Sequence, residues 1–547
     1  MQSEKVQVTP SAYSYPLIIK QLLHTPLATA LDQEIVYADK LRYTYRDFAR
    51  RIQRLAHGLS RNGVGTGSTV AVMDWDSHRY LECFFAVPML GAVLQTVNIR
   101  LSPEQILYTI NHAGADVLLV NREFLPVLKQ IREQLTTVKA FVLLDDDDSP
   151  LPAGFTTEYE SLLASSADEF DFPDFDENTR ATTFYTTGTT GLPKGVYFSH
   201  RQLVLHTLAV SAALGLAPVQ GRFHRDDVYM PLTPMFHVHA WGMPYVATLA
   251  GVKQVYPGRY QPATILKLIE REKVTFSHCV PTILHMLLTV PDGSAVDLSG
   301  WKIVIGGSAL TTALAEAALQ RGVDVFTGYG MSETCPILTL AQVDSAIADS
   351  GNHDGINTRT KAGRPIPLVD LQAVDAYMLT QPRDGKSTGE IVVRAPWLTQ
   401  GYLKDPVASE ELWEGGHLHT KDVGSIDSRG YLQVTDRIKD VIKTGGEWVS
   451  SLELEDIIGR HPAVSEAAVI AMPDEKWGER PFALVVLKSE FVGKVSEEDI
   501  RTHVRTFADG GHISKYGIPE QVKFVTELAR TSVGKLNKRA LREQRGA

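Results

Sequence analysis

Early in the chain, segments with a helical pattern alternate with short apolar segments, and this alternation constrains the fold more than any other feature. Thr44 is followed three residues later by Asp47 and then by apolar residues at helical spacing, which predicts a helix capped by Thr44. Ser102 begins a second capping box, with proline at the first helical position. Buried strands are expected at 69–73 and 116–120. The alternation predicts an α/β fold in which helices cover sheets.

The pattern changes along the rest of the chain. The acidic run Asp145–Asp148 indicates a solvated loop, and a second α/β stretch follows at about 182–340. After Gly363 the segments become short and strand-like, with glycine and proline between them. A last unit begins near Asp436, with a helix capped by Ser496 and strands at 482–487 and 521–525.

Composition excludes several classes of protein. The 547 residues include 54 basic and 64 acidic side chains, so the net charge of −10 gives no support to a nucleic-acid partner. Cys83, Cys279 and Cys335 form no CxxC pair and are expected as free thiols. The first nine residues are polar, unlike a secretory signal, and no apolar run is long enough for a transmembrane segment, so we expect a cytoplasmic protein.

The most informative motif is the glycine- and threonine-rich segment 185–195, YTTGTTGLPKG. Its glycines allow sharp turns that point successive backbone N–H groups at an anion, and its lysine adds a mobile positive charge. The spacing differs from that of a Walker A loop. We therefore expect a phosphate-binding loop of another kind, while a polar turn without a ligand is the alternative on spacing alone.

This segment resembles the signature of the adenylate-forming superfamily, which includes acyl-CoA synthetases, peptide-synthetase adenylation domains and luciferases. The resemblance covers about residues 20–545, and seven motifs occur in order. The segments 234–241, PMFHVHAW, and 443–450, KTGGEWVS, are closest to the fatty acyl-CoA synthetase branch. The resemblance implies a large N-terminal domain at 1–435, built of layered α/β subdomains and a β-rich subdomain. It further implies a hinge at 436–440 and a small, mobile α+β domain at 441–547.

The resemblance also assigns residues to ATP. Tyr329 is expected to stack on adenine, Ser332 to lie by the phosphate, and Asp422 to accept the ribose hydroxyls, although Lys421 stands where the family usually has glycine. Thr186 and Glu333 are expected to bind Mg²⁺, a hard cation that prefers oxygen ligands. The full expected nucleotide set is Thr186, Thr187, Gly188, Thr189, Thr190, Gly191, Lys194, Gly307, Ser308, Gly328, Tyr329, Gly330, Ser332, Asp422, Arg437, Lys439, Lys443 and Trp448.

A second group of residues is expected to bind the acid. By resemblance His237 lies by the reacting carboxylate, and Trp241 gates an acyl tunnel. On a helix these two side chains, four residues apart, would share a face. An ordinary core pair is the alternative for them, and a metal pair of His237 with His239 lacks a third ligand. The expected acyl pocket is His237, Trp241, Gly307, Cys335 and Pro336, and the pantetheine arm of CoA is expected to pass Gly445 and Gly446.

The expected catalytic residues are Lys535, Glu333, His237 and Thr186. Lys535 lies in the segment 530–535, RTSVGK, and its flexible ammonium group suits the α-phosphate of ATP. Lys439 corresponds to the pivot of the family's hinge. An exposed, charged residue can change its backbone angles there without disturbing a core.

We therefore predict an enzyme that uses ATP, Mg²⁺ and CoA to convert a medium- or long-chain fatty acid into acyl-CoA, AMP and pyrophosphate. Four alternatives stay open: a short, aromatic or sulfur-containing acid, a carrier protein as acyl acceptor, a luciferase-like oxygenase, and a protein that binds nucleotide without catalysis. Close relatives pair through the N-terminal domain, so a homodimer is expected as well.

Overall fold

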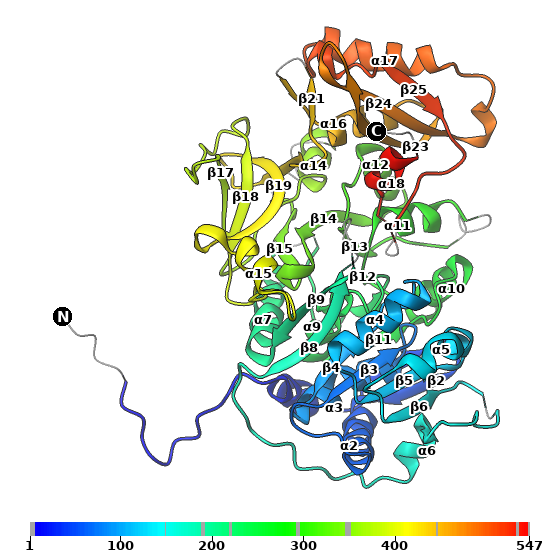
Figure 1. Ribbon diagram of the computed structural model, residues 1–547, viewed down its shortest axis with the longest axis vertical. Helices are drawn as coiled ribbons and strands as arrows, with labels where there is room; N and C mark the ends of the chain where they lie inside the picture. Colours follow the sequence, from blue (N-terminus) through cyan, green and yellow to red (C-terminus); the bar gives the residue numbers. More distant parts are fainter. Residues whose placement is uncertain are drawn as a thin grey trace.

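The computed structural model describes residues 6–147, 149–186, 192–217, 221–290, 296–344, 352–444, 447–531 and 535–544. Figure 1 shows a stack of units, with the C-terminal unit at one end and the first sheet at the other. The first described residues, from 6 onward, run away from the body as an extended arm. Among the described residues, no helix is long and apolar enough to cross a membrane.

The first sheet has seven strands in the described part of the chain, and most of its neighbouring strands are parallel. β9 pairs antiparallel with β8 at one edge. In spatial order the strands are β7 (Thr157–Glu158), β6 (Ala140–Leu144), β5 (Val117–Asn121), β3 (Thr69–Met73), β4 (Val93–Thr96), β8 (Arg180–Thr186) and β9 (Lys194–Ser199). Its strands are apolar on both faces because helices cover both faces.

The second sheet has nine described strands and runs through the middle of the chain. In spatial order they are β16 (Arg364–Pro365), β15 (Ile337–Leu340), β14 (Asp324–Gly330), β13 (Lys302–Ile305), β12 (Phe276–Cys279), β10 (Val228–Pro231), β11 (Lys253–Tyr256), β1 (Glu34–Tyr37) and β2 (Leu41–Thr44). The central strands from β14 to β1 are parallel. The first two strands of the chain therefore form one edge of this sheet, whose other strands come from the middle of the chain.

Helices fill the space between these sheets and cover their outer faces. α3 (His78–Met89) and α7 (His200–Leu216) each contact strands of both sheets, and they share one large apolar core with α9 (Met243–Ala250). Outer helices include α2 (Tyr45–Arg61), α4 (Pro103–Ala113), α10 (Pro262–Glu272), α11 (Pro281–Leu288) and α12 (Thr312–Gln320). The layered α/β architecture predicted from the alternation is confirmed.

Two smaller sheets complete the fold. An antiparallel sheet comprises β17 (Asp370–Val374), β18 (Gly389–Arg394), β19 (Leu418–Ile426) and β20 (Leu432–Arg437). The C-terminal unit contains β21 (Ile442–Thr444), β22 (Glu447–Val449), β23 (Val464–Asp474), β24 (Gly478–Leu487) and β25 (Gln521–Phe524) with α16 (Ser451–Gly459), α17 (Glu497–Asp509) and α18 (Lys538–Glu543). This unit has apolar cores of its own.

The helix caps read from the sequence are confirmed. Thr44 and Asp47 form a complete capping box at the start of α2, and Ser102 does the same for α4. Ser496 caps α17 with Asp499. Each box satisfies backbone N–H groups that the first helical turn leaves without partners.

The prediction of a solvated loop at Asp145–Asp148 is wrong for Asp145, whereas Asp146 and Asp147 are exposed as expected. Asp145 is buried and accepts a 2.6 Å hydrogen bond from Arg122 Nε. Asp146 forms 2.6 Å ion pairs with Arg79 and Lys40. The acidic run does not reveal its basic partners, because they are distant in sequence. The fold brings these basic side chains close to the carboxylates. Asp148 lies outside the described residues.

Lys421 in β19 adopts a left-handed backbone conformation, with φ of 59°. Its amide donates to Glu390 Oε1 at 3.1 Å, and its carbonyl accepts from Ile438 N at 3.0 Å. These contacts hold the backbone in a conformation that costs a side chain about 1–2 kcal/mol. The family's usual glycine is free of that cost.

Lys421→Gly should therefore raise the free energy of unfolding by about 0.5–1 kcal/mol, because the relief of strain exceeds the extra backbone entropy of glycine. Chemical denaturation monitored by circular dichroism measures the change. Lys421→Ala is the matched control, since alanine keeps the unfavourable Cβ and should give no gain. An equal gain from both variants would mean that the lysine side chain, and not its backbone conformation, is the source.

Candidate active site

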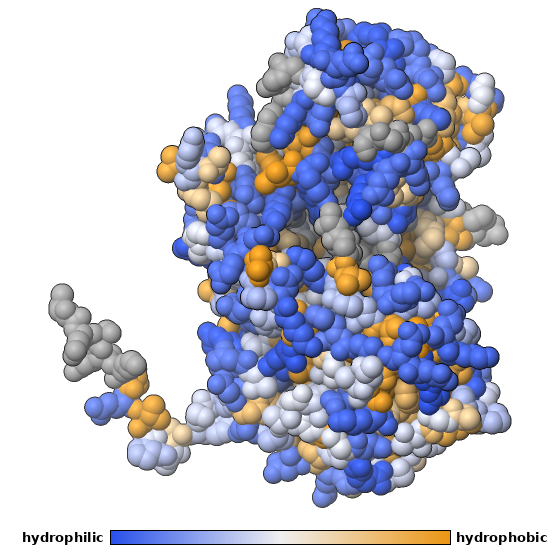
Figure 2. Space-filling model, in the orientation of Figure 1, coloured by the Kyte–Doolittle hydropathy of each residue, from blue (hydrophilic) through white to orange (hydrophobic). Residues whose placement is uncertain are grey.

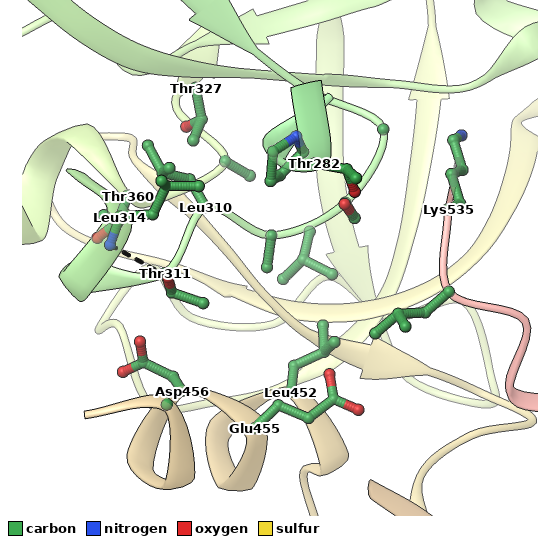
Figure 3. A pocket seen from close by; sticks show the side chains of 18 of the residues that line it. Thr282, Leu310, Thr311, Leu314, Thr327, Thr360, Leu452, Glu455, Asp456 and Lys535 are labelled. Carbon is green, nitrogen blue, oxygen red and sulfur yellow. Dashed lines mark hydrogen bonds between the residues drawn. The ribbon is translucent and has the colours of Figure 1, made fainter. Parts of the chain in front are cut away.

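Many of the predicted site residues line a cavity of about 1590 Å³ between the C-terminal unit and the second sheet. β8 ends at Thr186, β13 at Ile305 and β14 at Gly330, and segments around these ends line the cavity. In open α/β sheets, ligands bind beyond the carboxyl ends of parallel strands. Figure 3 shows Lys535 entering from one side of this cavity, and Glu455 and Asp456 on a helix below it.

Asp422 lies at the centre of one polar group in this cavity. Tyr329 donates a 2.7 Å hydrogen bond from its hydroxyl to Asp422 Oδ2, and Arg437 Nε lies 3.3 Å from Oδ1. Asp422 and Arg437 are cross-strand partners on β19 and β20, so the sheet register sets their distance. Burial raises the pKa of Asp422 despite the nearby Arg437. The ionised form of this carboxylate is therefore unfavourable unless further hydrogen-bond donors or positive charges bind to it.

Glu333 forms a second buried carboxylate. It lies in the short helical turn Ser332–Thr334, directly after β14. Tyr402 donates a 2.7 Å hydrogen bond to Glu333 Oε1, and Thr399 N donates to the Glu333 carbonyl at 3.0 Å. Burial raises the pKa of Glu333, and Tyr402 offsets only part of the effect. A cation placed here would relieve this cost.

Lys535 reaches the cavity from the C-terminal unit. Its Cε atom lies 3.0 Å from the position that a Cβ atom on Gly307 would take, so glycine at this position leaves the lysine side chain free of a tight contact. Gly307 also has a positive φ of 82°. Burial and the neighbouring Arg437 lower the pKa of Lys535 to about 8, against the opposing effect of Asp422 and Glu333. One ammonium group thus lies among two carboxylates and a guanidinium.

His237 also lines the cavity. Burial lowers its pKa to about 3, and the positive charges of Lys535 and Arg100 act in the same direction. The imidazole is therefore neutral near pH 7, and it contributes a donor or an acceptor but no charge.

The segment after His237 is not an ordinary helix, and the expectation of a shared helical face is wrong. Residues 238–241 all have positive φ, between 48° and 60°, and form a left-handed turn. Its hydrogen bonds run from Ala240 N to His237 O at 3.1 Å and from Gly242 N to His239 O at 3.0 Å. No spacing rule for right-handed helices applies to such a turn. It directs the Trp241 ring to within 5.0 Å of the His278 ring, measured between centroids.

Trp241 lines a small second cavity of about 30 Å³ beside the first. A Cβ atom on Gly306 would lie 2.9 Å from the Trp241 ring and 2.9 Å from Gly328 O, so the indole packs directly on the peptide. Of the expected acyl pocket, His237, Trp241, Gly307 and Pro336 line this cavity. Cys335 is buried beside it and is not a lining residue.

The remaining expected residues fall into three groups. Ser308, Gly328, Gly330, Ser332, Arg437 and Lys439 line the larger cavity. Lys194 lies beside it, 4.6 Å from the Tyr402 ring centroid and 3.7 Å from Asp405, while Lys443 is exposed and its amide donates to Glu479. Thr187, Gly188, Thr189, Thr190, Gly191, Gly445, Gly446 and the side chain of Trp448 lie outside the described part of the chain.

Sequence reasoning missed Tyr402, which holds the carboxylate of Glu333. The two residues are distant in sequence, and no charge pattern or spacing marks a tyrosine as the partner of a buried acid. It also missed Asp436, whose Oδ2 accepts from Ser451 N at 2.7 Å and from Ser451 Oγ at 2.6 Å. These bonds attach α16 directly to the end of β20.

A divalent cation fits this cavity only with help from a ligand. Among the described residues, no group of three or more His, Cys, Asp or Glu side chains could hold a metal. Glu333 supplies one carboxylate and Thr186 one hydroxyl at the same cavity. Oxygen donors of this kind suit Mg²⁺, which usually completes its shell with water and substrate phosphates.

Comparisons with known proteins agree with this geometry. The sequence profile of the AMP-binding enzyme family matches residues 21–403, and that of the AMP-binding enzyme C-terminal domain matches residues 453–535. A long-chain-fatty-acid–CoA ligase of Thermus thermophilus is 42% identical over 506 residues, covering 92% of this chain and 90% of that protein. A 3-methylmercaptopropionyl-CoA ligase of Ruegeria pomeroyi is 38% identical over 91% of this chain and 90% of its own length. A medium-chain-fatty-acid–CoA ligase of Ectopseudomonas oleovorans is 36% identical over 92% and 91%.

Solved structures share the whole architecture. The anthranilate CoA ligase AuaEII in complex with anthranoyl-AMP has a TM-score of 0.83 at 25% identity, covering 97% of this chain and 98% of its own. A Mycobacterium tuberculosis fatty acyl CoA synthetase has a TM-score of 0.71 at 28% identity, covering 96% and 98%.

The raised pKa of Glu333 has a consequence for stability. A carboxyl group whose folded pKa is raised destabilises the fold above its unfolded pKa and has no effect below it. Glu333→Gln should therefore raise the melting temperature at neutral pH, and the difference should vanish at low pH, where both states of the wild-type residue are protonated. Differential scanning fluorimetry across pH measures this. Glu490→Gln, at an exposed site, should change nothing, and a lower melting temperature for Glu333→Gln at neutral pH would contradict the analysis.

Proposed function

The chain belongs to the AMP-binding enzyme family, and from this premise we propose that it activates a medium- or long-chain fatty acid with ATP and transfers the acyl group to CoA. The observation that carries the proposal is that Lys535, Glu333 and Asp422 line one cavity and influence one another electrostatically. Lys535 comes from the C-terminal unit and the two carboxylates come from the second and third sheets. These charged groups come from three parts of the fold, and their charges do not cancel one another. Such an arrangement supports a site that binds a charged substrate.

The acid class rests on the relatives and on the pocket. The long-chain and medium-chain ligases are 42% and 36% identical to the chain over most of its length. The smaller cavity is lined largely by glycine and apolar side chains, which favours an apolar group, but its volume of about 30 Å³ would have to grow to take an aliphatic tail. A short sulfur-containing acid is the competing substrate, because the 3-methylmercaptopropionyl-CoA ligase is 38% identical and the cavity is small here.

In the first step, a carboxylate oxygen of the acid attacks the α-phosphorus of ATP, and pyrophosphate leaves. We propose that Asp422 accepts the ribose hydroxyls and that Tyr329 stacks on adenine. Lys535 neutralises the negative charge that develops on the α-phosphate, and the neutral His237 orients the acid. Mg²⁺ bound by Glu333 and Thr186 would supply charge neutralisation for the phosphates.

In the second step, the thiolate of CoA attacks the carbonyl carbon of the acyl-AMP, and AMP leaves. We propose that the small domain, 441–547, rotates on the hinge 436–440 about Lys439 between the two steps. The large domain is 1–435 in this scheme. Rotation withdraws Lys535 and brings Lys443, Trp448 and the glycines Gly445 and Gly446 toward the nucleotide and the pantetheine arm. A cytoplasmic location and a homodimer formed through the large domain belong to the same proposal.

Pyrophosphate release tests the function directly. Purified protein is supplied with ATP, Mg²⁺ and straight-chain acids from two to eighteen carbons, and with 3-methylmercaptopropionate, each with and without CoA. A CoA-dependent optimum at medium or long chains is the expected result. An optimum at the sulfur-containing acid would assign the competing substrate. Release that never depends on CoA would indicate a carrier protein as acceptor.

Lys535→Ala should separate the two steps. Loss of the ammonium group is expected to lower the rate of acyl-AMP formation by about 10²–10³-fold, as for the loss of one electrostatic stabiliser of a transition state. Thioester formation from supplied acyl-AMP and CoA should be nearly unchanged, because Lys535 is withdrawn by then. Quenched-flow assays of each half-reaction measure both rates. Loss of both half-reactions together would contradict this role.

The pKa of Lys535, about 8, predicts a falling limb in the pH profile of the first step. The lysine is charged below this pKa, so kcat/KM for ATP should fall as pH rises through about 8, approaching tenfold per pH unit above it. Lys535→Arg keeps its charge and should show a lower maximum without that limb. The same limb in both proteins would assign the titration to another group.

A further inference from the structure

Arg530 joins the C-terminal unit to α11, a helix that covers the second sheet. Its Nη1 donates a 2.8 Å hydrogen bond to Thr282 Oγ1, at the start of α11. Its Nη2 donates to Glu466 Oε1 at 2.7 Å, on β23 of its own unit. The guanidinium is therefore held by Glu466 of its own unit and by Thr282 of the other unit. Its two terminal nitrogens form hydrogen bonds on both sides of the boundary between the units.

Arg530 also forms the base of the loop that carries Lys535. Arg530 and Leu536 form an isolated antiparallel bridge. Thr531 N donates to Lys535 O at 2.7 Å, and Lys535 N donates to Thr531 Oγ1 at 3.2 Å. These contacts tie Lys535 to Thr531 and Leu536 to Arg530, so a shift of Arg530 moves the lysine with it.

A second contact crosses the same boundary. Asp456, on α16, accepts a 3.2 Å hydrogen bond from the backbone N of Thr312, the first residue of α12. Arg460 fixes the Asp456 carboxylate from one turn along the helix, at 2.6 Å. Figure 3 shows Asp456 facing Thr311 at the start of α12. The carboxylate also lies at the positive end of that helix.

Thr282 and Thr312 both line the cavity. α11 follows β12, and α12 follows β13 through the loop that contains Gly307, against which Lys535 packs. The contacts of Arg530, Asp456 and Lys535 with the second sheet's layer therefore fall on two consecutive β–α connections of one sheet. The unit is positioned by the same segments that line the cavity.

We propose that Arg530 and Asp456 form an interdomain latch that holds Lys535 in the cavity for the first step and opens for the second. This inference rests on the proposed two-step function. Both residues act through Lys535 and are positioning residues. Rotation of the small domain separates Arg530 from Thr282 and Asp456 from Thr312, while the pairs with Glu466 and Arg460 stay intact within the small domain.

The latch is suited to repeated opening. The side chains of Arg530 and Glu466 are 27% and 30% exposed, so water replaces the lost partner when the domains separate. A partly exposed hydrogen bond to a charged group is worth a modest amount, so two of them favour one orientation without locking it.

The first test compares the half-reactions of Arg530→Ala and Asp456→Ala. Each variant should lower the rate of acyl-AMP formation by about tenfold, the expected effect of a lost hydrogen bond to a charged group. Thioester formation from supplied acyl-AMP and CoA should be unchanged or faster. Arg505→Ala is the matched control, since Arg505 pairs with Glu498 within the small domain and should leave both rates unchanged. Equal losses in both half-reactions, or no loss in either, would overturn the latch.

Thr282→Val separates positioning from direct contact with substrate. It removes only the hydroxyl of the large domain, so it should reproduce most of the Arg530→Ala effect, and the double variant should be no worse than Arg530→Ala. An increase in KM for ATP in Arg530→Ala that Thr282→Val does not reproduce would assign Arg530 to substrate binding instead.

A second test needs no activity and so distinguishes failure of the latch from failure of the proposed function. Cysteines introduced as Leu216→Cys and Val492→Cys lie at exposed sites on the large and small domains, and the three native cysteines are buried. Energy transfer between dyes at these sites reports the domain orientation. Arg530→Ala and Asp456→Ala should broaden or shift the distribution of the otherwise intact protein, and Arg505→Ala should not. An unchanged distribution in both latch variants would overturn the proposal, whether or not the protein releases pyrophosphate.

Discussion

The burial of one ammonium group among carboxylates from other parts of the chain is the interaction on which the site depends. Lys535 lies with Asp422 and Glu333 inside a cavity, where a charge without partners would be prohibitively expensive. The lysine enters this environment only because the C-terminal unit docks against the second sheet. Docking of the C-terminal unit brings the lysine to the carboxylates, and the attraction between these charges in turn favours the docked position. The lowered pKa of Lys535 and the raised pKa values of both acids indicate that compensation stays incomplete until an anion and a cation bind.

The backbone does as much as the side chains to shape this cavity. Gly307 leaves space for the lysine stem, and residues 238–241 form a left-handed turn that costs about 1–2 kcal/mol per residue. The turn is enclosed by buried residues of the large core, which offset that cost. Strain of this kind persists where the surroundings fix the conformation, and it occurs often at functional sites.

Much of the fold could be predicted from the sequence because its signals are local. The capping boxes at Thr44, Ser102 and Ser496 follow from residue types three positions apart, and the buried strands follow from apolar runs. The left-handed turn could not be predicted, since Val238 and Trp241 are residues that normally avoid positive φ. Tyr402 and Thr282 carry no local signal either. Their partners lie 69 and 248 positions away, and pairing at that range is decided by tertiary packing.

Gly306 lines the small cavity, and the Trp241 indole packs directly on its peptide. A side chain at this position would meet Trp241 on one side and the Gly328 carbonyl on the other, so one of them would have to move. Glycine is already the smallest residue, and no substitution at this position can make the small cavity larger. Any gain in its volume must therefore come from its other lining residues, of which Trp241 is the largest.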